Sequence, residues 1–111
     1  MLVIVSGTYR HRVTIQKRDV REDDLGQTQS GWSDVFSNIS ALVEDLSGRE
    51  LLAAQEIHST VNTRIRIRYR PSITADMRVI HKGRNYNIET AIRADNLNVE
   101  LILLCSAGLV V

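Results

Sequence analysis

Hydrophobic and polar residues alternate with a period of two along much of the chain, a pattern that is typical of half-buried β-strands. Six stretches show this alternation or are short apolar runs, and they cover residues 11–17, 32–43, 63–70, 77–81, 86–94 and 98–105. The link between the fourth and fifth stretches contains Gly83 and fits a β-hairpin. The pattern therefore predicts a mainly β fold, a small antiparallel β-barrel or sandwich of about six strands.

The period changes after the second strand, where one short helix is predicted over residues 48–58. Ser47 and Glu50 have the spacing of a capping box, in which each side chain binds the backbone of the other residue. Leu46 and Leu51 stand where a hydrophobic staple needs them. Because isolated helices of this length are marginal in water, the helix should dock on the strands or stay mobile.

Residues 18–31 lack such a period and hold mostly polar side chains, with two glycines and only Val20 and Leu25 as apolar residues. We therefore predict a long loop there, of the kind that often carries function. The two ends of the chain, residues 1–5 and 106–111, are apolar tails. Because chain ends are usually polar and loose, we expect these tails to order only against neighbouring subunits.

Length and charge narrow the possible functions. A chain of 111 residues predicts one domain over residues 1–111. Its formal net charge of +1 argues against a protein whose main task is to grip nucleic acid. The only cysteine, Cys105, excludes an internal disulfide. No stretch approaches the ~20 apolar residues of a membrane-spanning helix, so we expect a soluble protein with no membrane partner.

Residue types that catalyse reactions or bind metals do not occur at the spacings that those functions need. His11, His58 and His81 are far apart in the sequence and lack the spacing of a zinc motif. Cys105 ends an apolar strand and has no activating base near it in the sequence. We therefore expect a protein that is not an enzyme, with no catalytic residue, no metal and no cofactor.

Arginine alternates with apolar residues along the third predicted strand. This spacing places four guanidinium groups on one face, those of Arg64, Arg66, Arg68 and Arg70. Such a face could be solvated, could pair with carboxylates of a neighbouring subunit, or could contact DNA phosphate. We favour the subunit interface. The segment 44–56 has the opposite sign, since four acidic residues against Arg49 give a local charge of −3.

Short motifs along nearly the whole chain resemble the head-tail joining family of tailed phages, the head-completion, stopper and adaptor subunits between portal and tail. The matching residues are 10–16, Leu25, Gly26, Trp32, Val35, Phe36, Ile39, 48–50, Ala54, 67–70, Ile73, 78–80, Gly83, Arg84, Tyr86, Ile88, Leu103 and Cys105. The chain departs from the family at Phe36 and Ser37, where members often carry tryptophan and alanine.

The resemblance implies a β-barrel that assembles with its own copies into a ring. This ring would lie between a portal or adaptor protein and a tail terminator or tail tube protein, in the virion and, during assembly, in the host cytoplasm. Double-stranded DNA would pass through it without sequence-specific contacts. The resemblance also places residues 44–60 toward the channel, as a gate that helps to retain DNA. The implied gate residues are Glu44, Asp45, Leu46, Ser47, Gly48, Arg49, Glu50 and Glu56.

Two other functions remain open from the sequence. A tail-terminator subunit is also a small ring-former of strands and one helix. A small β-barrel nucleic-acid-binding protein would need exposed aromatic residues on which bases can stack. Because Tyr69 and Tyr86 fall on apolar faces of their strands, the second alternative is the weaker one.

Overall fold

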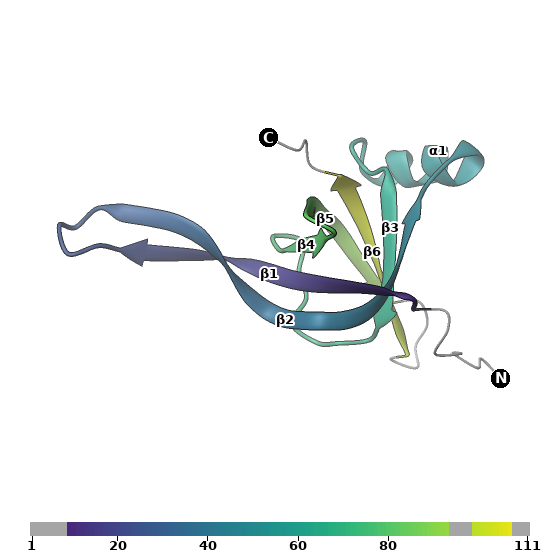
Figure 1. The fold of residues 1–111 in the computed structure, drawn as a ribbon. Coiled ribbons are helices and arrows are strands. Elements are labelled where there is room, and N and C mark those ends of the chain that lie inside the picture. The colour runs from purple at the N-terminus through teal and green to yellow at the C-terminus, as the bar shows by residue number, and fades with distance from the viewer. Residues whose placement is uncertain (1–8, 94–98, 108–111) are drawn as a thin grey trace.

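A computed structural model describes residues 9–93 and 99–107, which form a closed antiparallel β-barrel with one short helix. The elements are β1 (His11–Glu22), β2 (Thr28–Asp45), α1 (Gly48–Ile57), β3 (Thr63–Arg68), β4 (Arg78–His81), β5 (Arg84–Arg93) and β6 (Glu100–Ala107). The strands follow the order β1-β2-β3-β6-β5-β4, and β4 pairs with β1 to close the barrel (Figure 1). The predicted fold class, a small antiparallel barrel or sandwich of about six strands with a helix after the second strand, is confirmed, and the sheet closes as a barrel.

The barrel interior is filled by the apolar positions of the alternating strands. In β3, Ile65 and Ile67 are fully buried, whereas the arginines that alternate with them point away from the core. Val13 and Ile15 of β1 belong to the same core cluster. Burying a side chain of this size stabilises the folded state by about 1.5–3 kcal/mol. The period of two in the sequence therefore accounts for the closed core.

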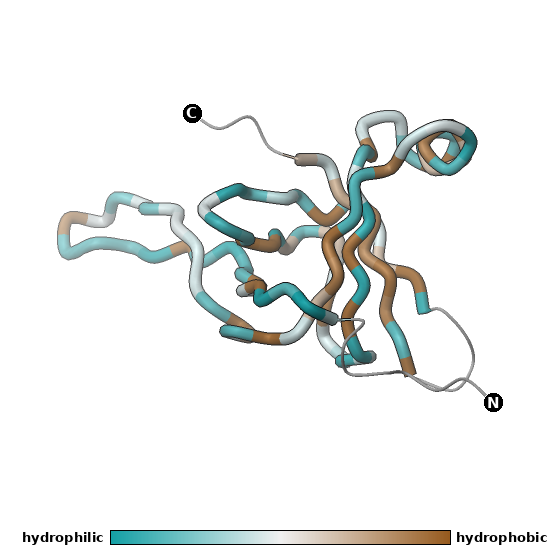
Figure 2. The backbone as a smooth tube through the Cα atoms, turned by 45° about the vertical axis from the view of Figure 1, so that its right-hand side comes forward, coloured by the Kyte–Doolittle hydropathy of each residue, from teal (hydrophilic) through white to brown (hydrophobic). Residues whose placement is uncertain are grey.

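The long loop predicted at residues 18–31 is wrong. The outer parts of β1 and β2 pair there as an antiparallel ribbon, with Asp19 opposite Gly31 and Glu22 opposite Thr28. We call residues 18–31 the ribbon. It projects well beyond the barrel, and the molecule is 56 Å long against 27 and 26 Å in the other directions (Figure 1). Figure 2 shows that the ribbon is mostly hydrophilic, because neither face lies on the core and the alternation that marks a half-buried strand is missing.

Two irregularities in β2 turn the chain from the barrel into the ribbon. Val13 pairs with Ile39 and Ile15 with Phe36, so β2 contains one more residue than β1 over this interval. Asn38, inside that interval, has a φ of 54°, a left-handed conformation that asparagine tolerates better than most residues. A β-bulge bends the strand that carries it and increases its twist. These bulges therefore explain the curvature of β2 (Figure 1).

Two further predicted boundaries need adjustment. The third strand ends at Arg68, so Arg70 lies beyond it. Residues 106–107 belong to β6 and are not part of a tail. The apolar tails at residues 1–5 and 108–111 lie outside the described residues.

Candidate functional site

The helix α1 is docked at one end of the barrel (Figure 1). Ala54 is its buried residue, and it packs in a second apolar cluster with Leu46, Val61 and Leu104. Leu51 packs against the same cluster, so both residues of the predicted hydrophobic staple take part. The short helix is therefore held by tertiary contacts, as its marginal length requires.

The predicted capping box is wrong. Ser47 is the N-cap residue by position, with an extended backbone, but its side chain makes no capping hydrogen bond. The carboxylate of Glu50 lies instead 3.5 Å from Arg64. Glu50 thus pairs with Arg64 of β3 and not, as the capping box predicted, with the backbone of Ser47. The turn into the helix uses Gly48, whose φ of +56° most side chains rarely adopt.

A charged network joins this end of the barrel to the helix. Glu44 of β2 lies opposite Arg64 of β3 and accepts two hydrogen bonds from its guanidinium, at 3.2 Å from Nε and 3.1 Å from Nη2. These bonds raise the pKa of Arg64 above its already high value. Arg66 Nε lies 3.3 Å from the same carboxylate, although it is buried and makes no well-directed hydrogen bond to a described residue. Two of the four predicted interface arginines thus have partners within the chain.

The other two arginines face a different surface. Arg68 is exposed, and the guanidinium of Arg70 lies over the ring of Phe36 at 4.9 Å. Together with Arg12 they line a hollow beside the β2 bulge, whose other lining includes Asn38. We call this surface the arginine hollow. The predicted row of four arginines is therefore split by the structure into a pair bound to acids and a pair that is open to a partner.

The outer side of the gate segment is both acidic and apolar. Among the implied gate residues, Asp45, Ser47, Gly48, Arg49, Glu50 and Glu56 are exposed, Glu44 is half-buried and Leu46 is buried. Leu52 and Ile57 of α1 are 65% and 63% exposed, which is high for large apolar side chains. The helix therefore exposes two large apolar side chains, which lie five positions apart and so on different sides of its surface.

The base of the ribbon is fixed by a stacked tryptophan. The guanidinium groups of Arg18 and Arg78 lie 5.3 and 4.1 Å from the ring centroid of Trp32. Arg78 also donates to Gln16, which in turn donates to Asp34 across the β1–β2 pair. Cation–π contacts of this kind contribute about 0.5–1 kcal/mol at exposed sites. The ribbon is therefore held at a defined angle to the barrel.

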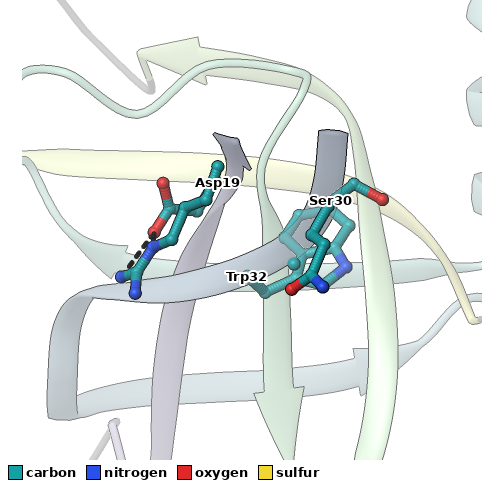
Figure 3. Close-up of a pocket in the computed structure, with 6 residues that line it drawn as sticks. Asp19, Ser30 and Trp32 are labelled. Atoms are coloured by element: carbon teal, nitrogen blue, oxygen red, sulfur yellow. Dashed lines mark hydrogen bonds and ion pairs between the residues drawn. The ribbon is translucent and has the colours of Figure 1, made fainter. Parts of the chain in front are cut away.

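A shallow pocket lies along one side of the ribbon. Figure 3 shows Asp19, Ser30 and Trp32 around it, with the ion pair between Asp19 and Arg21 at 3.0 Å. The pair is exposed and contributes little to stability. Asp19 and Arg21 are the titratable residues that line this pocket, and they are paired with each other, so the pocket is better suited to a protein contact than to catalysis.

The titratable residues considered for chemistry serve the fold. His11 and His81, distant in sequence, meet with ring centroids 5.0 Å apart, and His11 Nδ1 accepts a hydrogen bond from the Val43 amide. His58 pairs with Glu89 at 3.2 Å. Burial raises the pKa of the Cys105 thiol well above its usual range. Within residues 9–93 and 99–107, no three histidine, cysteine or acidic side chains cluster as metal ligands would.

These features define a small closed β-barrel with a projecting ribbon, a docked helix and several uncovered charged surfaces, which is an architecture suited to contacts between proteins. Residues 4–108 match the phage head completion protein family, and the chain belongs to this family. The family is structural and not enzymatic, which gives the chain a structural role in joining the phage head to the tail.

Two solved structures share the fold. The solution structure of protein SF1141 from Shigella flexneri 2a is 30% identical, with a TM-score of 0.77, and the match covers 92% of this chain and 95% of that chain. A chain in the virion of a native gene transfer agent particle is 13% identical, with a TM-score of 0.56 and coverage of 87% and 93%, and shows the fold alone. None of the curated proteins matches the sequence. Among the described residues, no helix has the length and apolar character needed to cross a membrane.

Proposed function

We propose that copies of this chain form a ring in the virion at the head–tail junction, between a portal or adaptor protein and a tail terminator or tail tube protein. The observation that carries this proposal is the family match, which spans residues 4–108. The similar chain in the virion of a gene transfer agent particle supports a place in the particle. The subunits would assemble in the host cytoplasm before they join the head.

The uncovered surfaces of the barrel support a ring subunit. A ring requires each copy to present two different surfaces that fit each other. The ribbon projects from one part of the molecule, α1 exposes Leu52 and Ile57 at another, and the arginine hollow lies at a third. A barrel of 111 residues that acted as a monomer would not need all three of these exposed features.

Residues 44–60 act in this proposal as the gate that faces the channel and helps to retain DNA. The acidic residues of this segment differ in whether an arginine compensates their charge. Glu44 is engaged by Arg64 and Arg66, so its charge is largely compensated. Asp45 and Glu56 are exposed and make no ion pair among the described residues, so their charges would repel DNA phosphate. DNA would then pass without being gripped and without any reading of its bases.

The test replaces the two exposed acids that make no ion pair among the described residues and spares Glu44 and Glu50, which pair with Arg64. In the phage that encodes the chain, Asp45 and Glu56 would both be changed to lysine. A control pair, Asp45→Asn with Glu56→Gln, removes the charges without adding attraction. DNA-filled heads, DNA retained on storage and ejection rate would be measured after confirming that the variant protein is present in the particles.

The proposal expects altered retention or slowed ejection in the lysine pair and a smaller effect in the neutral pair. Unchanged filling, retention, ejection and titre would show that the segment does not face DNA, and would leave a purely structural ring subunit. If the unaltered protein is missing from purified particles, the ring itself is refuted.

A further inference from the structure

We propose that the tip of the ribbon of one copy docks in the arginine hollow of the next copy around the ring. We define the ribbon tip as residues 22–26. This inference rests on the proposed ring, and it names the two surfaces that would join neighbouring subunits. It follows from the charge and shape of two features that lie on different parts of one chain.

The arginine hollow is a cationic surface with an apolar floor. Arg12, Arg68 and Arg70 line it, and none of them forms an ion pair with a described acidic residue. Phe36 and Ile39 supply apolar lining. Because guanidinium groups are forked and weakly hydrated, they suit carboxylates at protein interfaces. The hollow therefore fits a ligand that combines carboxylates with an apolar side chain.

The geometry of the hollow is fixed by the β2 bulge. Arg12 Nη1 donates to the carbonyl oxygen of Asn38 at 3.4 Å, which links β1 to the bulged residues. Arg70 is held over Phe36. Two of the three cations are thus anchored before any partner binds, which lowers the entropy that binding would cost.

The ribbon tip has the complementary composition. Glu22 and Asp24 are exposed, and Leu25 is 85% exposed, the highest value among the large apolar side chains of the described residues. Asp23 is used internally, because its Oδ1 accepts the amides of Leu25 and Gln27 at 2.9 and 2.8 Å. That turn holds the tip in one shape. It presents the exposed carboxylates of Glu22 and Asp24 together with the exposed Leu25 side chain.

The contact would propagate from copy to copy. A tip and a hollow on different parts of the molecule make a heterologous interface, which generates a ring when the rotation between copies closes. The length of the molecule, 56 Å against about 27 Å across, allows the ribbon to reach beyond its own barrel. DNA phosphate could also bind guanidinium groups, but it would leave Leu25 and the apolar floor unused, so we favour the tip.

A cysteine pair tests the contact in assembled particles. Leu25→Cys lies on the tip and Ser37→Cys lines the hollow. The native Cys105 is buried, so it should not react. Phage that carry both substitutions would be treated with a short bismaleimide and analysed on a denaturing gel. Head-to-tail docking predicts a ladder of covalent multimers that needs both cysteines, whereas either single substitution should leave monomers.

Charge reversal tests the same contact through complementarity. Asp24→Arg alone and Arg68→Glu alone should each reduce incorporation of the protein into particles by about tenfold, and the two together should restore most of it. Arg84→Glu, an exposed arginine at the start of β5 that does not line the hollow, is the matched control and should have little effect.

The outcomes separate this inference from the proposed function. Particles that contain the protein but give no ladder, with no rescue by the reversed pair, would overturn the docking and leave the ring standing. If Arg68→Glu changes DNA retention and not incorporation, the hollow serves DNA and the inference fails. If the unaltered protein is missing from particles, both proposals fail together.

Discussion

Replacing Glu44 by glutamine should destabilise the free subunit more than any other single change of an implied gate acid. Glu44 is shared by two arginines, since it accepts two hydrogen bonds from Arg64 and lies 3.3 Å from Arg66 Nε. Glutamine keeps the size of the side chain but removes its charge, so two half-buried guanidinium groups would lose their counterion.

The expected loss of stability in Glu44→Gln follows from how exposed the three charged side chains are. The side chains of Arg64, Glu44 and Arg66 are 19%, 30% and 33% exposed, between the surface and the interior. Breaking an exposed ion pair costs up to about 1 kcal/mol and breaking a buried one about 3–5 kcal/mol, so we expect about 2 kcal/mol for Glu44→Gln. For a chain of this size that loss lowers Tm by about 8 °C.

Glu50→Gln is the matched control. Glu50 is 64% exposed and lies 3.5 Å from Arg64, so its loss should cost less than about 0.5 kcal/mol. Urea unfolding followed by circular dichroism would give the free energy of unfolding for both variants. The double variant Glu44→Gln with Arg64→Met should recover part of the loss, because it leaves one fewer unpaired charge. Equal effects of Glu44→Gln and Glu50→Gln would refute the reasoning.

Three further predictions concern the stability of the fold around the gate segment. Burial, and then the neighbouring His81, lower the pKa of His11 below its ordinary value of 6.5, so the unfolded chain takes up the proton more readily. Stability should therefore be greatest well above pH 6.5 and should fall as the pH drops through 6.5 toward the lowered pKa of the folded state, and urea titrations should show a flatter pH dependence in His11→Gln. Ser47→Ala should change the free energy of unfolding by less than about 0.5 kcal/mol, since no capping bond is lost. In the same urea series, Leu46→Ala should cost about 2–4 kcal/mol, and a clear loss in Ser47→Ala would contradict the observed helix start.

Local patterns in the sequence were enough to predict the barrel and the helix. Ile65 and Ile67 alternate with arginines because one face of β3 is buried and the other is not, and this contrast is visible in any window of a few residues. The hydrophobic staple of Leu46 and Leu51 also joins residues that are close together in the sequence. Such features depend on near neighbours along the chain, so a pattern along the chain can reveal them.

Tertiary structure decided the ribbon and the distribution of the arginines. The ribbon has no buried face, so its residues show no period of two, and only their cross-strand pairing shows that they form strands. Asn38 in an otherwise strand-like segment was the one local hint of the bulge that shapes the hollow. The register of β2 on β3 sets Glu44 against Arg64, twenty residues away, and thereby separates the paired arginines from the open ones. A side chain's partner depends on which strands lie side by side, and that is settled only when the barrel closes.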